Sequence, residues 1–322
     1  MKVLVTGVAG QLGHDVMNEL AKRGYEGIGS DIAKSYNGIQ DGTPVVSMPY
    51  VQMDITDKAS VEKVLTEVNA DAVIHCAAWT AVDLAEDEDK KDKVHAVNAE
   101  GTKNIAEVCK KLDSKMVYTS TDYVFNGQGE EPWQPDCKDY QPLNVYGQSK
   151  LDGELAVSET LDKYFIVRIA WVFGKNGNNF IKTMLKVGKN HDKLRVVNDQ
   201  IGTPTYTFDL ARLLVDMIET DKYGYYHATN EGGYISWYDF TKEIFRQAVE
   251  QGHTEYGEDR ITVDPVTTAE YGVSKAARPF NSRLDKKKLV ENGFTPLPTW
   301  QDRKSTRLNS SHITRSRMPS SA

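Results

Sequence analysis

Residues 2–13 read KVLVTGVAGQLG, a short apolar run that leads directly into three glycines spaced three residues apart. The β-branched run predicts a buried strand, and the apolar residues that follow at helical spacing predict a helix. Between the two, Gly7 allows a sharp turn, Gly10 lets the backbone approach a pyrophosphate closely, and Gly13 lets the helix pack against the strand. This order of strand, glycine-rich turn and helix predicts a dinucleotide-binding βαβ unit, with the phosphates at the helix N-terminus.

The same alternation of short β-branched runs and longer amphipathic stretches continues through the first half of the chain. Strands separated by helices at this spacing predict a parallel sheet with right-handed crossovers. Ser236 is expected to cap the last predicted helix. We expect strands at 2–6, 25–30, 51–54, 72–76, 115–120 and 165–169, and helices at 11–23, 58–68, 95–112, 180–188, 207–219 and 238–250.

The predicted fold class is therefore α/β, a Rossmann-type doubly wound parallel sheet with a smaller C-terminal substrate domain. We expect an NAD(P)-binding domain over residues 1–170 and a mainly substrate-binding domain over 171–301, with elements that return to the first. From 302 to 322 apolar residues nearly vanish, so this tail is expected to be disordered. Its composition is closer to translated sequencing-adapter sequence than to native protein, and the alternative is a genuine basic tail.

The overall composition is that of an ordinary soluble globular protein, with 39% hydrophobic and 26% charged residues. A net charge of −7 argues against a nucleic-acid-binding protein, which needs a basic face. Cys76, Cys109 and Cys137 are odd in number and widely spaced, which argues against disulfides and indicates a reducing compartment. With no secretory signal and no apolar stretch of about 20 residues, the expected location is the cytoplasm, with no membrane partner.

Two carboxylates follow predicted strands at positions that suit a dinucleotide. Asp31 ends the second strand, where a carboxylate accepts hydrogen bonds from the adenosine ribose. Because the charge of Asp31 repels a 2′-phosphate, it slightly favours NADH over NADPH; the alternative is an Asp that caps a helix. Asp54 and Ile55 close the third strand, where the carboxylate is expected near the adenine or, alternatively, in an exposed turn.

Tyr146 and Lys150 are four residues apart, which places them on one face of a helix. The lysine ammonium is expected to lower the tyrosine pKa, so that the phenol can give a proton to a carbonyl oxygen that receives a hydride. Ser120 and Thr121 end the fifth strand, at the edge where open α/β sheets bind ligands, and a hydroxyl there can polarise the reacting carbonyl. The alternatives are a chance pair on an exposed helix and a simple Ser/Thr cap.

Seven segments together resemble the extended short-chain dehydrogenase/reductase superfamily and, within it, the dTDP-4-dehydrorhamnose reductase family. They are TGVAGQLG, CAAWTAVDLAE, STDYVFNG, YGQSK, RIAWVFG, NDQIGTPTY and ARPFNSRLD, and the resemblance runs from Met1 to about Trp300.

This resemblance implies a role for each matching residue. Tyr146 is then the proton donor, Lys150 its lysine and Thr121 its hydroxyl partner, and Thr121, Asp122 and Trp171 contact the substrate. The cofactor contacts that it implies are Gly10, Gln11, Leu12, Asp31, Asp54, Ile55, Ala78, Trp79 and Thr80, beside Gly7, Gly13, Tyr146 and Lys150.

The reaction implied by the resemblance is the NAD(P)H-dependent reduction of the 4-keto group of dTDP-4-dehydro-L-rhamnose to dTDP-L-rhamnose. A sugar-nucleotide dehydratase or epimerase is an alternative, although Tyr123 stands where dehydratases carry a glutamate. A non-catalytic protein similar to the regulatory subunit of methionine adenosyltransferase is another. Some relatives dimerise through magnesium; Asp15 could be one ligand, but no others match, so we predict no metal and leave a homodimer as an expectation.

The nucleotide diphosphate of such a substrate needs cationic partners in the second half of the chain. Arg278 lies in a loop-like segment beside Pro279 and is the first candidate, with Arg283 as the second. The alternative is that both arginines form surface salt bridges.

Overall fold

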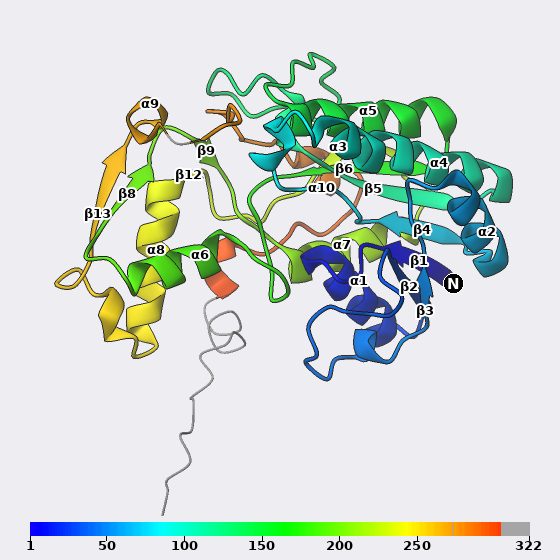
Figure 1. Cartoon of the computed structure of the whole chain (residues 1–322), viewed down its shortest axis with the longest axis horizontal. Helices are drawn as coiled ribbons and strands as arrows, with labels where there is room; N and C mark the ends of the chain where they lie inside the picture. Colours follow the sequence, from blue (N-terminus) through cyan, green and yellow to red (C-terminus); the bar gives the residue numbers. More distant parts are fainter. Residues whose placement is uncertain (273, 304–322) are drawn as a thin grey trace, which may run out of the picture.

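The computed structural model of the chain describes residues 1–272 and 274–303 (Figure 1). The last described element is the short 3₁₀ helix η6 (Trp300–Arg303). The tail predicted over 302–322 therefore lies outside the described residues from position 304 onward.

A seven-stranded parallel sheet forms the centre of the molecule, in the order β11-β6-β5-β4-β1-β2-β3. Its strands are β1 (Lys2–Thr6), β2 (Glu26–Asp31), β3 (Tyr50–Gln52), β4 (Ala72–His75), β5 (Lys115–Thr121), β6 (Tyr164–Ile169) and β11 (Gly224–His227). Strands β1 to β6 are arranged in the strand order of the Rossmann fold, so the predicted fold class and the six predicted strands are confirmed. Strand β11 was not predicted, because its GYYH sequence is short and contains no β-branched residue.

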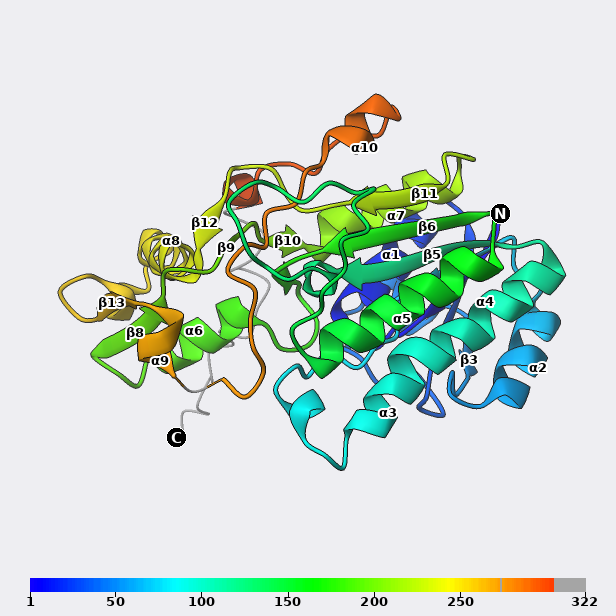
Figure 2. The ribbon, with the colours of Figure 1, turned by 90° about the horizontal axis from the view of Figure 1, so that it is seen from above.

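Helices cover both faces of the sheet (Figures 1 and 2). Contacts group α1 with α7 on one face and α2, α4 and α5 on the other. The predicted helix at 95–112 is real but begins earlier, and the π-helical turn η3 separates its two α-helical parts. The helices are α1 (Gln11–Lys22), α2 (Lys58–Val68), α3 (Lys91–His95), η3 (Ala96–Glu100), α4 (Gly101–Leu112), α5 (Val145–Thr160), α6 (Phe180–Gly188), α7 (Thr207–Ile218), α8 (Trp237–Glu250), α9 (Thr268–Tyr271) and α10 (Lys287–Glu291), with short 3₁₀ turns η1 (Pro44–Val46), η2 (Leu84–Glu86), η4 (Asp122–Val124) and η5 (Thr254–Tyr256).

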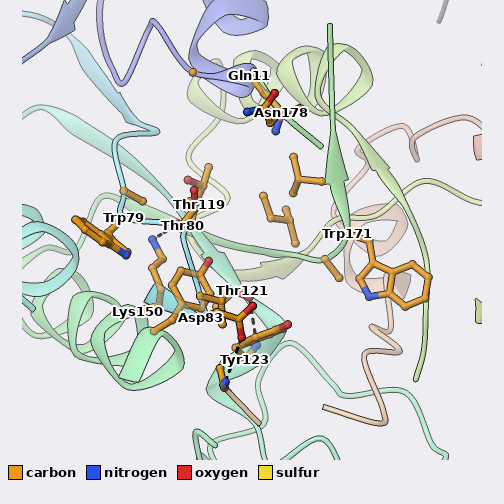
Figure 3. Close-up of a pocket in the computed structure, with 18 of the residues that line it drawn as sticks. Gln11, Trp79, Thr80, Asp83, Thr119, Thr121, Tyr123, Lys150, Trp171 and Asn178 are labelled. Atoms are coloured by element: carbon orange, nitrogen blue, oxygen red, sulfur yellow. Dashed lines mark hydrogen bonds between the residues drawn. The ribbon is translucent and has the colours of Figure 1, made fainter. Parts of the chain in front are cut away.

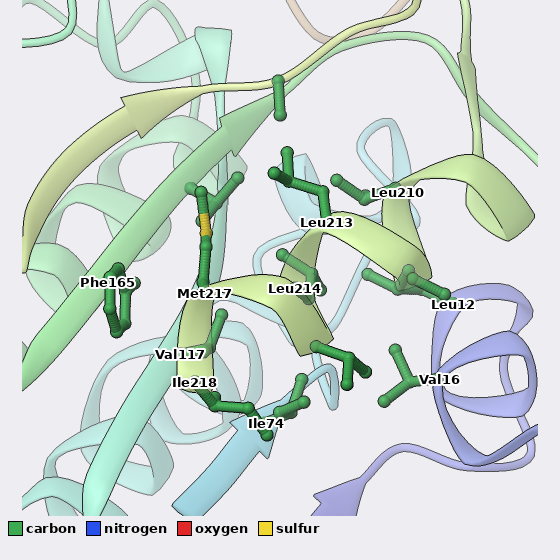
Figure 4. Close-up of a cluster of buried hydrophobic side chains, with 14 of the residues drawn as sticks. Leu12, Val16, Ile74, Val117, Phe165, Leu210, Leu213, Leu214, Met217 and Ile218 are labelled. Atoms are coloured by element: carbon green, nitrogen blue, oxygen red, sulfur yellow. The ribbon is translucent and has the colours of Figure 1, made fainter. Parts of the chain in front are cut away.

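The alternation of side chains along the strands divides the core into two layers. Val3 and Val5 face α1 and α7, whereas Leu4, between them, faces the α2 and α4 side. Figure 4 shows apolar side chains of α7 between the strands and α1, with Leu213 and Met217 directed at the sheet. Helix α7 and strand β11, both from the second half of the chain, thus complete the core of the first.

The remaining elements of the second half form a smaller lobe beside the carboxyl end of the sheet (Figure 2). Its core is aromatic, with Phe173, Phe240 and Phe245 packed among α6 and α8. Ser236 caps α8, as predicted, and forms a capping box with Asp239. The strands of this lobe pair in twos and are β7 (Val172–Phe173) with β10 (Thr205–Tyr206), β9 (Ile201–Gly202) with β12 (Ile235–Ser236), and β8 (Lys193–Val197) with β13 (Thr262–Val266).

Candidate active site

A cavity of about 1710 Å³ opens at the carboxyl end of the sheet, between the sheet and the smaller lobe (Figure 3). Pockets for one drug-sized ligand usually measure about 300–1,000 Å³, so this cavity has room for a cofactor and a substrate together. The residues that the sequence assigns to the cofactor, the substrate or catalysis line this cavity, with the exception of Arg283.

The glycine turn after β1 forms one end of the cavity and has no space for side chains. Gly7 has a φ of +70°, and a Cβ there would lie 2.7 Å from the backbone nitrogen of Ala77. A Cβ on Gly13 would lie 2.4 Å from the carbonyl oxygen of Gly7. Helix α1 starts after Gly10 with no side-chain cap, so its first N–H groups are available to an anion in the cavity. The turn therefore fits the pyrophosphate of a dinucleotide.

Asp31 and Asp54 lie beyond this turn, where the second and third strands end. The carboxylate of Asp31 accepts hydrogen bonds from the backbone N–H of Ala9, at 3.2 Å, and of Ile32, at 2.8 Å. Asp54 accepts from both the N–H and the hydroxyl of Thr56, at 2.9 and 2.7 Å. Both carboxylates line the cavity, and both also organise their own turns.

The segment after β4 passes under the cavity and is held by Asn98, which the sequence analysis missed. The side chain of Asn98 accepts from the N–H of Trp79 at 2.8 Å and donates to its carbonyl at 3.1 Å. It also donates to the hydroxyl of Ser149 at 2.9 Å, so it joins this segment to α5. Asn98 is buried and lies in the π-helical turn η3, and no signal in the sequence marks that turn.

Lys150 lies beneath the cavity, on the second turn of α5. Its Nζ donates to the carbonyl oxygen of Thr119 at 2.7 Å and lies 4.1 Å from the centre of the Tyr118 ring. Burial lowers the pKa of Lys150 to about 7, although Glu154 acts in the opposite direction. Burial thus destabilises the charged form of Lys150, and the nearby Glu154 offsets only part of this effect.

Tyr146 begins the same helix, one turn earlier, and its phenol faces the end of β5. Burial raises the pKa of Tyr146 above its usual value, whereas a hydrogen bond with Thr121 acts in the opposite direction. Lys150 is not among the groups that shift this pKa, so the expected lowering of the tyrosine pKa by the lysine is wrong for this structure. The ring of Tyr123 packs edge-on against Tyr146, with 5.6 Å between the ring centres.

The end of β5 supplies polar groups beside this phenol. The hydroxyl of Thr121 donates to a carboxylate oxygen of Asp122 at 3.1 Å and accepts from the N–H of Tyr123 at 3.3 Å. Burial raises the pKa of Asp122 to about 6. Figure 3 shows Thr121 and Lys150 at one edge of the cavity. Tyr146, which shares a hydrogen bond with Thr121, lines the same cavity, so a carbonyl group there could accept two hydrogen bonds.

The second half of the chain forms the opposite wall. Trp171 has a φ of +50°, a strained backbone for a residue other than glycine, and its ring stacks on Trp237 at 3.7 Å. Arg278 lines the cavity and donates to the carboxylate of Asp83 at 2.6 Å. Arg283 is absent from the described lining and bonds Asn281 at 3.1 Å, so its candidacy as a second diphosphate partner is wrong for this structure. Trp237, which also lines the cavity, was not predicted from the sequence.

Asp15 is buried in α1 away from this cavity. Its carboxylate contacts His14 at 3.1 Å and accepts from the hydroxyl of Thr207 at 2.5 Å. Over residues 1–272 and 274–303, no three His, Cys, Asp or Glu side chains are grouped so that they could hold a metal ion. The helices within these ranges are also too short or too polar to cross a membrane.

A dinucleotide-type glycine turn and a Thr–Tyr–Lys group that share one cavity on a Rossmann sheet define an oxidoreductase of the short-chain dehydrogenase/reductase class.

Comparison with known proteins narrows this class. The family model of the RmlD substrate binding domain matches residues 1–312, and the chain belongs to this family. The chain is 37% identical over 308 residues to the dTDP-4-dehydrorhamnose reductase of Aggregatibacter actinomycetemcomitans, which covers 93% of this chain and 96% of that protein. It is 36% identical over 295 residues to the spore coat polysaccharide biosynthesis protein SpsK of Bacillus subtilis, with 92% and 93% covered.

Solved structures give the same relationship. The dTDP-4-dehydrorhamnose reductase of Bacillus anthracis in complex with NADP superposes with a TM-score of 0.82 at 37% identity, covering 97% of this chain and 100% of that chain. The orthologue from Clostridium acetobutylicum has a TM-score of 0.82 and 38% identity, with 96% and 99% covered.

Proposed function

We propose that this protein reduces the 4-keto group of dTDP-4-dehydro-L-rhamnose to a hydroxyl with NAD(P)H, which yields dTDP-L-rhamnose. The observation that carries the proposal is that Thr121, Tyr146 and Lys150 line one cavity together with the glycine turn. Relatives that are named for this activity match nearly the whole chain.

In this proposal the nicotinamide supplies a hydride to carbon 4 of the sugar. Thr121 and Tyr146 orient the keto oxygen by hydrogen bonds, and the phenol of Tyr146 transfers its proton to that oxygen as the hydride arrives. The raised pKa of Tyr146 keeps the phenol protonated, which is the form that can donate. Lys150 holds the ribose next to the nicotinamide.

For the substrate, we propose that Asp122 and Trp171 contact the deoxysugar and that Arg278 contacts the diphosphate. Arg278 has one guanidinium nitrogen on Asp83, while a second is buried without a hydrogen-bond partner among the described residues. Arg278 lines the cavity, and its cationic guanidinium carries more N–H donors than the ion pair with Asp83 uses.

For the cofactor, we propose contacts from the glycine turn, from Asp31 and Asp54, and from the Ala78–Thr80 segment. The carboxylate of Asp31 supports a slight preference for NADH, because it repels a 2′-phosphate. A cytoplasmic location and a homodimer stay predictions from the sequence.

The test is the loss of NADH or NADPH absorbance with dTDP-4-dehydro-L-rhamnose as substrate, followed by identification of the product. We expect turnover with formation of dTDP-L-rhamnose. Binding of cofactor and sugar nucleotide without turnover would instead favour a non-catalytic regulatory protein. Formation of a dehydrated or epimerised sugar without net cofactor oxidation would favour the other enzymatic alternatives.

A further inference from the structure

The polar groups of the glycine turn are almost completely paired inside the protein. The N–H of Ala9 donates to Asp31 at 3.2 Å, and the N–H of Gly10 donates to the carbonyl oxygen of Gly7 at 3.0 Å. The carbonyl oxygens of Ala9 and Gly10 both accept from Nδ2 of Asn176, at 2.7 and 3.1 Å. One buried side chain from the second half of the chain thus holds two consecutive peptide groups of the turn.

The hydrogen bonds from Asn176 to the turn also set the direction of the N–H group of Gln11. In a trans peptide the carbonyl oxygen and the following N–H lie in one plane and point in opposite directions. Because Asn176 holds the carbonyl oxygen of Gly10, it also fixes the N–H of Gln11, the first residue of α1. Gln11 lines the cavity, and no side chain caps the start of this helix.

We propose that Asn176 is a positioning residue for the dinucleotide pyrophosphate. It holds the glycine turn in the conformation in which the N–H groups at the start of α1 face the phosphates, and it does not touch the cofactor itself. The inference rests on the proposed dinucleotide site.

Contacts with Gln11 hold the segment that carries Asn176 against the glycine turn. Asn179 caps α6 and donates to the side-chain oxygen of Gln11 at 2.9 Å. Gly177 has a φ of +66°, and a Cβ there would lie 3.2 Å from Cγ of Gln11. Gln11 and Asn178 both line the cavity, and Figure 3 labels them at the same end of it. Since α6 follows directly, the segment links the phosphate turn to the wall of the smaller lobe.

The amide of Asn176 suits this role and leaves little freedom for substitution. Its two N–H groups serve the two carbonyl oxygens, and its oxygen accepts from the N–H of Gly177 at 2.9 Å. In Asn176→Ala all of these bonds are lost. In Asn176→Asp the donors are replaced by a carboxylate that faces two carbonyl oxygens, so a larger effect is expected than in the alanine variant.

The experiment measures the dissociation constants of three probes with the full chain. NADH is titrated by its fluorescence, and ADP-ribose and adenosine are measured by competition with NADH. For Asn176→Ala we expect NADH and ADP-ribose to bind about 10-fold more weakly, with a larger loss in Asn176→Asp. Adenosine, which lacks the pyrophosphate, should bind as in the wild type. Asn190→Ala is the matched control, because Asn190 is exposed beyond α6 and its side chain donates to the carbonyl oxygen of Lys186 at 2.9 Å, away from the glycine turn.

The probes separate a positioning role from a general loss of structure. An unchanged affinity for ADP-ribose in Asn176→Ala would overturn the inference, and so would an equal loss for adenosine. Thermal melts check that each variant is folded. If the aspartate variant does not fold, the binding data of the alanine variant alone decide between the two outcomes. If the wild-type protein itself binds neither NADH nor NADPH, the proposed function fails together with the inference, which is a distinguishable result.

Discussion

The wall of the cavity that belongs to the sheet and the wall that belongs to the smaller lobe place their side chains in different ways. On the sheet side, Asp31 and Thr121 lie at strand ends, so the parallel topology brings them to one edge, and Tyr146 lies in the first turn of α5 beside that edge. On the lobe side, Trp171 and Arg278 come from loops that are far apart in the sequence.

Contacts between the two halves of the chain hold the lobe side in place. Arg278 is anchored by Asp83, 195 residues away, and Asn176 reaches the glycine turn across 166 and 167 residues. The comparison indicates that the sheet wall provides the chemistry, whereas the lobe wall provides affinity and depends on contacts across the molecule. Changes to Thr121 or Tyr146 on the sheet side should therefore affect turnover, changes to the cofactor contacts of that side should affect cofactor binding, and changes on the lobe side should affect binding.

The largest effect is expected for Tyr146→Phe, which removes the proton donor from the sheet wall. Turnover should fall at least about 10²-fold, the usual scale for a positioned general acid, while the dissociation constant of NADH stays unchanged. Steady-state kinetics and fluorescence titration measure the two quantities. Tyr234→Phe is the control, because Tyr234 lies outside the described lining of the cavity. Near-full activity of Tyr146→Phe would remove this tyrosine from the mechanism.

A pH effect of up to about 10-fold per pH unit is expected for cofactor affinity. In the unliganded protein burial lowers the pKa of Lys150 to about 7, and a bound pyrophosphate should raise this pKa again. Below that pH the lysine is charged in both states and affinity is constant. Above it, binding must take up a proton, so affinity falls as the pH rises.

Titrations of NADH binding across this pH range test the dependence. Lys150→Arg keeps its charge at every relevant pH and should flatten the curve. A wild-type dissociation constant that stays constant well above pH 7 would show that Lys150 does not titrate on cofactor binding.

On the lobe wall, Arg278→Ala should raise the KM for the sugar nucleotide about 10-fold and change kcat little, because a charge-assisted hydrogen bond to the diphosphate is lost. Arg283→Ala is a matched control, since Arg283 lies outside the described lining of the cavity. Equal KM values for the two variants would show that Arg278 serves only its ion pair with Asp83.

The smallest effect, a few-fold, is expected for cofactor choice. Asp31→Asn removes the charge that repels a 2′-phosphate but keeps an oxygen that can accept from the N–H of Ala9. The ratio of kcat/KM for NADPH to that for NADH should rise by about 3-fold, within the range of one exposed charge contact. The ratio is the decisive quantity, because a disturbed glycine turn would weaken both cofactors alike. An unchanged ratio would place Asp31 away from the ribose.

The predicted elements that matched the structure are those whose apolar residues, at strand or helix spacing in the sequence, are also buried in the folded protein. The β-branched run at 2–6 becomes β1, and the spacing of Val61, Val64 and Leu65 buries one face of α2. Strand β11 was not predicted, because it forms through pairing with β6 and not through a pattern of its own. The π-helical turn η3 was not predicted, because it has no characteristic sequence pattern.

The sequence alone determined the order of strands and helices, the glycine turn and the Tyr146–Lys150 spacing, because these depend on residues close together in the chain. Tertiary structure alone decided that burial raises the pKa of Tyr146, and that Asn98 and Asn176 hold the backbone around the cavity. Burial arises only when the chain packs together, and so do hydrogen bonds between segments that are far apart in the sequence, such as the 19 residues from Trp79 to Asn98 and the 167 from Ala9 to Asn176. No local pattern of residues records them.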